Sequence, residues 1–95
     1  MKIVWSRQAR DDLLQIYRHI AADNRSAARA LHEKITARVT SLLQSPHIGR
    51  PGRVPGTREL VITSTSYIVP YRFVGDTLQI LRVYHSAQLW PKSFD

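Results

Sequence analysis

Arginines beside three strand-like runs near the carboxyl end are the residues best suited to chemistry. Arg58, Arg72 and Arg82 each lie on or just before one of these runs. Pairing of adjacent strands would bring the three side chains to a common patch. Guanidinium groups gathered on a concave sheet bind phosphate or an acidic helix through forked, charge-assisted hydrogen bonds. Arg50 and Arg53 in the preceding loop would extend this patch, so these five arginines and His85 are the candidate target-binding residues.

A second interpretation of the same arginines stays open. Arg72 or Arg82 would instead be neutralised inside the fold, either by Glu59 or by a helical carboxylate such as Asp12. Residue by residue, the sequence favours neither interpretation, because both place a guanidinium beside oxygen atoms.

His85 is the candidate for proton transfer. It follows the most apolar strand-like run, three residues after Arg82. Histidine exchanges a proton near neutral pH, so His85 could act as a general acid or base at the rim of the sheet, with Arg82 and Arg58 on a phosphate. The plainer interpretation is a hydrogen-bonded histidine that ends a strand.

Other classes of site have little support in the sequence. The four histidines are scattered, there are no cysteines, and no glycine-rich phosphate loop or zinc-ligand spacing occurs. Glu59 is the only carboxylate in a predicted strand, so hydrolysis by paired carboxylates has no basis. We therefore expect neither a metal site nor a cofactor.

Length and charge limit the number of domains and the classes of partner. Ninety-five residues suffice for one domain, residues 1–95, and the formal charge of +7 comes mostly from arginine. A small basic domain most often contacts nucleic acid or an acidic protein, although a basic surface without such a role is also common. The sequence contains no apolar run of signal-peptide or membrane-span length, which predicts a cytoplasmic protein without a membrane partner.

Helical periodicity accounts for the first half of the chain. A short edge strand over Lys2–Trp5 is followed by Ser6, which is suited to cap a first helix ending near Ala22. Ser26 is expected to cap a second helix that stops at Ser45-Pro46. Both helices carry one apolar stripe, which predicts an antiparallel hairpin that needs a third layer.

The second half is predicted to form strands. A long irregular segment from Pro46 to Thr57 comes first. Three strands follow, with a tight turn at Gly75-Asp76 before the last and an irregular tail after it; their ranges are Glu59–Ile62, Tyr67–Phe73 and Leu78–Tyr84, with the tail over His85–Asp95. The expected fold is α+β: an N-terminal strand, then a helical hairpin packed on a mostly antiparallel sheet with three C-terminal strands.

Five segments in order resemble the RelE/ParE superfamily of bacterial toxins. None is specific alone, but their order and spacing together cover nearly the whole chain. They are Ser6–Leu13 with Ile16–Ala21, Leu42–Gly52 with its P-x-x-G-R-P loop, Gly56–Leu60, Tyr67–Arg72 and Ile80–His85.

The resemblance implies the toxin of a type II toxin–antitoxin system, neutralised by a small antitoxin encoded by an adjacent gene. The carboxyl-terminal segment of the antitoxin would wrap over the helical hairpin and sheet. RelE-like members cleave messenger RNA in the ribosomal A site, whereas ParE-like members inhibit DNA gyrase and are not nucleases themselves.

The resemblance also favours one branch. Basic residues that the RelE-like nucleases use are replaced here by Glu59, Val61 and Ile68, and no arginine follows His85. The long helical hairpin and the Gly-Arg-Pro loop look more like the ParE branch. Gyrase inhibition is therefore the favoured function, with a ribosome-dependent endoribonuclease as the alternative and a non-toxic basic interaction module as a third possibility.

Overall fold

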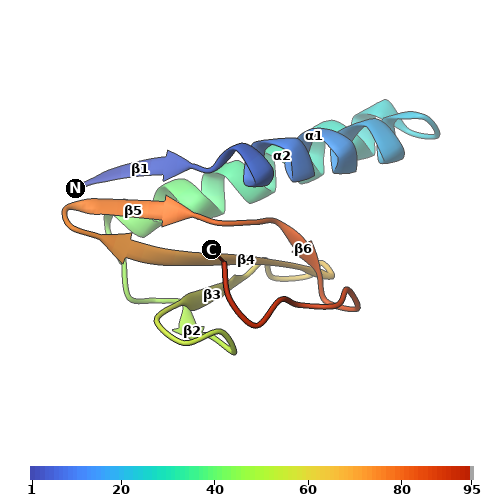
Figure 1. Ribbon diagram of the computed structural model, residues 1–95. Coiled ribbons are helices and arrows are strands. Elements are labelled where there is room, and N and C mark those ends of the chain that lie inside the picture. Colours follow the sequence, from blue (N-terminus) through green and yellow to red (C-terminus); the bar gives the residue numbers. More distant parts are fainter. Residues whose placement is uncertain (95) are drawn as a thin grey trace.

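The computed structural model describes residues 1–94 and contains a helical hairpin beside a six-stranded sheet (Figure 1). Asp95, the last residue of the predicted domain and tail, lies outside the described residues. The elements are β1 (Lys2–Trp5), α1 (Arg7–Ala21), α2 (Arg25–Thr40), the 3-10 helix η1 (Ser41–Leu43), β2 (Arg50–Pro51), β3 (Arg58–Val61), β4 (Tyr67–Val74), β5 (Thr77–Ile80) and β6 (Tyr84–His85).

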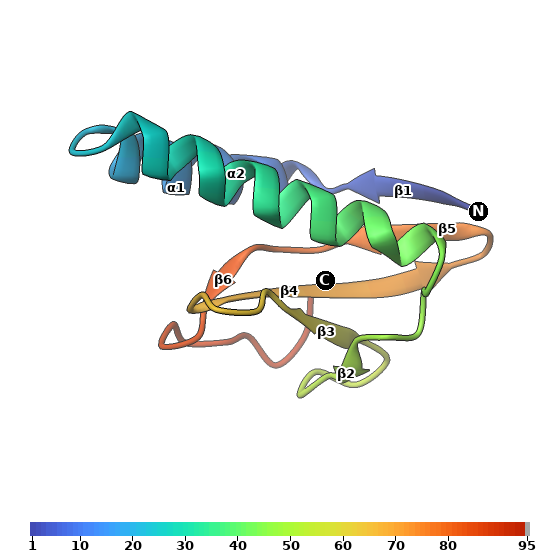
Figure 2. The ribbon, with the colours of Figure 1, turned by 180° about the vertical axis from the view of Figure 1, so that it is seen from behind.

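The helices α1 and α2 run antiparallel and cover one face of the sheet, as predicted (Figures 1 and 2). Ser6 caps α1, since its Oγ accepts the N–H of Ala9 at 3.0 Å. The predicted cap of α2 was wrong, because Asn24 and not Ser26 holds that place. Asn24 has extended backbone, and its Oδ1 accepts the N–H of Ala27 at 3.0 Å, so Ser26 lies inside the first turn.

The sheet has the strand order β1-β5-β4-β3-β2, and β6 also pairs with β4. Only β1 and β5 are parallel; every other pair is antiparallel. The α+β fold with a mostly antiparallel sheet and an edge strand at the amino end is thus confirmed. Gly75 in the β4–β5 turn has φ of 59°, a conformation that favours glycine.

The last predicted strand is broken in two. β5 ends at Ile80 because Pro70 on the facing strand has no N–H to donate; only its carbonyl takes part, accepting the N–H of Leu81 at 2.9 Å. The chain then bends toward α1, where Asp12 accepts the N–H of Val83 at 3.0 Å, before β6 pairs again with β4. The prediction of one continuous strand over Leu78–Tyr84 was therefore wrong.

The loop after η1 is pinned to the sheet by a buried tyrosine. The hydroxyl of Tyr71 accepts the N–H of Gly49 at 3.0 Å and donates to the carbonyl of Pro46 at 2.8 Å. A Cβ at Gly49 would lie 2.6 Å from the Tyr71 ring, so the close approach requires glycine. This predicted irregular segment, residues 46–57, also contains the short strand β2, which pairs with β3.

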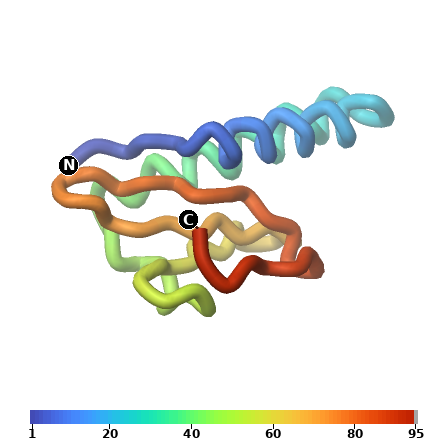
Figure 3. The backbone as a smooth tube through the Cα atoms, viewed as in Figure 1, coloured from blue at the N-terminus to red at the C-terminus, as the bar shows by residue number. Residues whose placement is uncertain are grey.

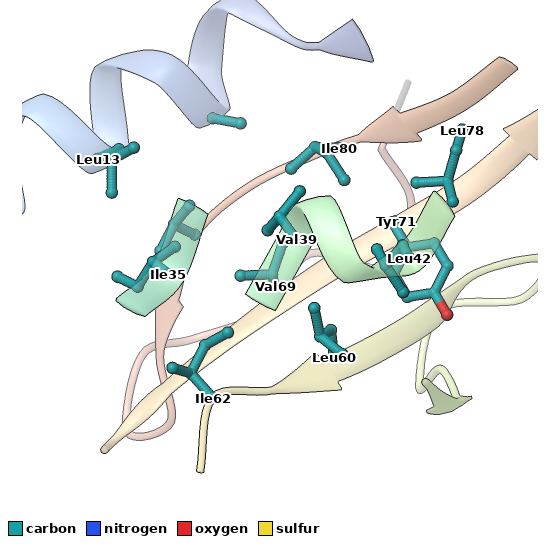
Figure 4. Packing of buried hydrophobic residues seen from close by; sticks show 12 residues of the cluster. Leu13, Ile35, Val39, Leu42, Leu60, Ile62, Val69, Tyr71, Leu78 and Ile80 are labelled. Atoms are coloured by element: carbon teal, nitrogen blue, oxygen red, sulfur yellow. The ribbon is translucent and has the colours of Figure 1, made fainter. Parts of the chain in front are cut away.

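The hydrophobic core lies between the hairpin and the sheet (Figure 4). Its helical side is formed by Ala9, Leu13, Ile35, Val39 and Leu42, and its sheet side by Leu60, Ile62, Val69, Tyr71, Leu78 and Ile80. Because strand side chains alternate, the residues between these sheet positions point to the opposite face. In the described chain, no helix is long and apolar enough to cross a membrane.

Candidate functional site

The sheet face turned away from the helices, here called the open face, carries a polar row across neighbouring strands. Glu59 of β3 pairs with Pro70 of β4, and Arg72 of β4 pairs with Gln79 of β5. Nε of Arg72 donates to Oε1 of Gln79 at 2.9 Å. Arg72 forms no ion pair within residues 1–94. Its positive charge therefore stays unneutralised on the open face.

Glu59 is a buried carboxylate, 2% exposed, that clamps two arginines of the preceding loop. Arg50 donates to it from Nη2 at 3.0 Å; Arg53 donates from Nε at 3.0 Å and from its backbone N–H at 2.8 Å. Burial alone would raise the pKa of Glu59, but the hydrogen bonds from Arg53 and Arg50 outweigh it and hold the pKa below its ordinary value. The two guanidiniums are fixed while still in contact with solvent.

Arg82 is bound to a helix. Its Nε and Nη2 donate to Oδ2 and Oδ1 of Asp12 at 2.7 and 2.9 Å, which is the forked geometry of the strongest ion pairs. The pairing raises the pKa of Arg82 further. The internal pairing with Asp12 that the sequence left open is thus present, and the guanidinium also lies over the ring of Tyr84, 4.7 Å from its centroid.

Arg58 is not part of the open face. It pairs with Tyr71, so its side chain leaves the sheet on the side of the helices. There Nη1 donates to the carbonyls of His47 at 3.2 Å and Gly49 at 2.7 Å. The prediction of one patch for all three strand arginines was therefore wrong: Arg72 and Arg82 share a surface, but Arg58 supports the loop after η1.

A cleft of about 260 Å³ lies where Arg72 and Arg82 meet the carboxyl-terminal tail. Figure 3 shows the tail turning back along the sheet after β6. In the tail, the ring of Phe94 stacks on that of Tyr84. The guanidinium of Arg53 lies over the ring of Trp90, 3.8 Å from the ring centroid, which is a cation–π contact. The sequence predicted an irregular tail over His85–Asp95 and no role for these aromatic residues.

His85 lies at the far end of β4 from Arg58. It is exposed, its Nδ1 accepts the N–H of Ala87 at 3.2 Å, and its ring meets Tyr67 edge-on. His85 pairs with Tyr67 and Arg58 with Tyr71, which separates them by about 13 Å along β4 alone, at roughly 3.3 Å per residue. The structure does not bring His85 and Arg58 together around one phosphate.

A second surface lies beside the edge strand. It is a mainly apolar groove of about 720 Å³ between β1 and the helical hairpin. Its lining is Ile3, Val4, Trp5, Arg10, Leu13, Leu14, Tyr17, His32, Thr36 and Thr40. Leu14 is 45% exposed and falls beside the stripe that faces the core, which is the sequence signal that could have revealed this groove.

No group of three or more potential metal ligands gathers within residues 1–94. What the described residues bring together instead is a set of fixed arginines, an aromatic tail and an apolar groove.

Comparison with known proteins agrees with this geometry. The family model of the ParE toxin of the type II toxin–antitoxin system parDE matches residues 3–90. The chain belongs to the ParE toxin family. A curated relative from Sinorhizobium fredii, named as a candidate toxin Y4kP, is 40% identical over 91 residues, which is 96% of this chain and 94% of the relative.

A solved structure, of the chromosomal ParDE system from P. aeruginosa, has the same fold as this chain. It superposes with a TM-score of 0.81 at 32% identity and covers 90% of this ParE chain and 95% of that chain. The resemblance to the RelE/ParE superfamily is therefore confirmed, as is its ParE branch.

Proposed function

We propose that this ParE toxin stops growth by poisoning DNA gyrase, and that the open face with the tail is its contact surface. Arg50, Arg53, Arg72 and Arg82 are held there by Glu59, Gln79 and Asp12. Arginines fixed before binding lose less conformational entropy when a partner arrives. Aromatic residues beside them, such as Trp90, are the other residue type enriched at binding hot spots.

The observation that carries this proposal is the separation of Arg58 and His85. RNA cleavage by the 2′-hydroxyl needs groups that activate the hydroxyl, stabilise the phosphorane and protonate the leaving oxygen around one phosphate. Two of the three candidates for these roles lie about 13 Å apart along β4. The ParE family is the branch that acts on gyrase, so family and geometry support the same function.

The direct test is a supercoiling assay with purified bacterial gyrase and antitoxin-free toxin. We expect loss of supercoiling while translated messenger RNA stays intact, and a weaker effect for Arg72→Gln than for the exposed control Lys34→Gln. Unaffected supercoiling at a toxin excess would overturn the proposal. Codon-positioned cuts abolished by His85→Ala would establish the ribosome-dependent nuclease instead, and harmless overexpression would favour the non-toxic interaction module.

The antitoxin is the second partner in this proposal. We place the neutralising segment of a cognate antitoxin, encoded by an adjacent gene, in the apolar groove beside β1. The exposed side chains of Val4 and Leu14 give this groove apolar surface that a partner would bury. The edge of β1 away from β5 also lacks a neighbouring strand in the described chain, so an extended segment could pair with it.

A further inference from the structure

The tip of the helical hairpin carries positive charge that folding does not explain. Arg18 near the end of α1 and Arg25 and Arg29 at the start of α2 are exposed. Within residues 1–94 none of the three forms an ion pair. The first turn of α2 contains no acidic residue. Cations near the positive end of a helix dipole are unfavourable, so Arg25 lowers the stability of α2 where an acid would raise it.

These three arginines surround one hollow. It has a volume of about 450 Å³ and is lined by Tyr17, Arg18, Ala21, Ala22, Arg25 and Arg29. Arg25 and Arg29 are four residues apart on α2 and therefore share one helix face, while Arg18 comes from the other helix. The nearby carboxylate in the turn, Asp23, is exposed and forms no ion pair in the described chain.

The hollow lies where an extended ligand has access. Figures 1 and 2 show the hairpin tip projecting beyond the end of the sheet, away from the tail and the open face. All three cations are arginines, whose planar fork suits phosphate oxygens better than an ammonium group does. Tyr17 in the same hollow offers a ring and a hydroxyl next to them.

We propose that this hairpin tip is a docking surface for the phosphodiester backbone of nucleic acid. Binding at the tip would not depend on the base sequence of the nucleic acid, because contacts with phosphates position a protein without specifying bases. It does not depend on the action on gyrase, and the open face takes no part in it. For a toxin that meets gyrase on its DNA, the tip would raise the local concentration of the protein along the duplex.

The test is binding of the full-length toxin to a short fluorescent DNA duplex of mixed sequence, followed by anisotropy between about 50 and 200 mM salt. Arg18, Arg25 and Arg29 are replaced together by glutamine. The matched control replaces the three lysines, Lys2, Lys34 and Lys92, by glutamine, which removes the same charge elsewhere.

We expect the arginine variant to bind more weakly and to lose about two to three units of the salt slope, because each phosphate contact contributes about 0.9. The lysine variant should keep most of the slope. Equal losses in both variants would show attraction by net charge alone and overturn the proposal, as would an unchanged slope in the arginine variant. Loss of binding to a polyglutamate peptide but not to DNA would assign the tip to an acidic protein and also overturn it. Gyrase inhibition by the wild type is measured separately, so the two proposals fail independently.

Discussion

Arg82 and Asp12 are joined by a forked ion pair across 70 residues of chain, with the shorter contact at 2.7 Å. Asp12 also accepts the backbone N–H of Val83 at 3.0 Å. One half-buried carboxylate on α1 therefore fixes both the guanidinium and the bend of the chain between β5 and β6. The pair connects the helical layer to the open face.

Replacement of Asp12 by alanine should destabilise the fold. It leaves the guanidinium of Arg82 and the N–H of Val83 without their acceptor, at a cost of about 1–3 kcal/mol. Urea unfolding should show a lower midpoint at an unchanged slope. Asp11→Ala, at the exposed neighbouring position, is the control and should stay near the wild type. An unchanged midpoint in Asp12→Ala would contradict the role of this pair.

Glu59 should make stability fall in acid. Its pKa is lowered in the folded protein from the ordinary 4.5, so its contribution is complete above that value and is lost as the pH falls through the folded pKa. Melting temperatures measured from pH 7 down to pH 3 should therefore fall more steeply for the wild type than for Glu59→Gln. The two proteins should differ most at pH 7, and the difference should shrink as the pH falls below 4.5 toward the lower folded pKa. A constant difference across this range would exclude the ion pairs with Arg50 and Arg53 as its cause.

Gly49→Ala should loosen the loop after η1. The new methyl group would lie 2.6 Å from the buried Tyr71 ring, and the core would have to move or release the loop. Overpacking of this kind costs about 1–3 kcal/mol. Thermal unfolding measures the loss, and Gln44→Ala in the exposed part of the same connection is the control. A melting temperature equal to that of the wild type would show that the ring yields freely.

Leu14→Glu should separate neutralisation from toxicity. The carboxylate would have to lose its water when the antitoxin occupies the apolar groove, which should weaken binding by about tenfold or more. Growth should stop with the variant alone and also with the antitoxin co-expressed. Gln15→Glu, which adds the same charge outside the groove lining, should remain neutralised. Full neutralisation of Leu14→Glu would move the antitoxin to another surface.

The elements of this fold were predictable because their patterns are local. The apolar stripes of α1 and α2 and the turn at Gly75 depend on neighbours in sequence, and each was found. The break after Ile80 was not, because it depends on Pro70 of the facing strand and on Asp12 of α1. Only the register of β4 against β5 places Pro70, which has no N–H, opposite the residue that follows Ile80.

The candidate site was predictable in composition but not in arrangement. The sequence placed Arg58, Arg72 and Arg82 near the strands, yet a shift of one residue in register decides which face each occupies. Glu59 appeared as a possible partner for Arg72 or Arg82, and the structure pairs it with Arg50 and Arg53 through β2. The two-residue length of β2 left too little pattern to detect.

The parallel pairing of β1 with β5 has a consequence for synthesis of the toxin. Lys2 and Trp5 are made well before their partners Thr77 and Ile80. Until β5 has been made, β1 has no strand to join, and α1 has no Arg82 for Asp12. Pairing of β1 with the sheet is therefore a late, long-range step of folding during synthesis.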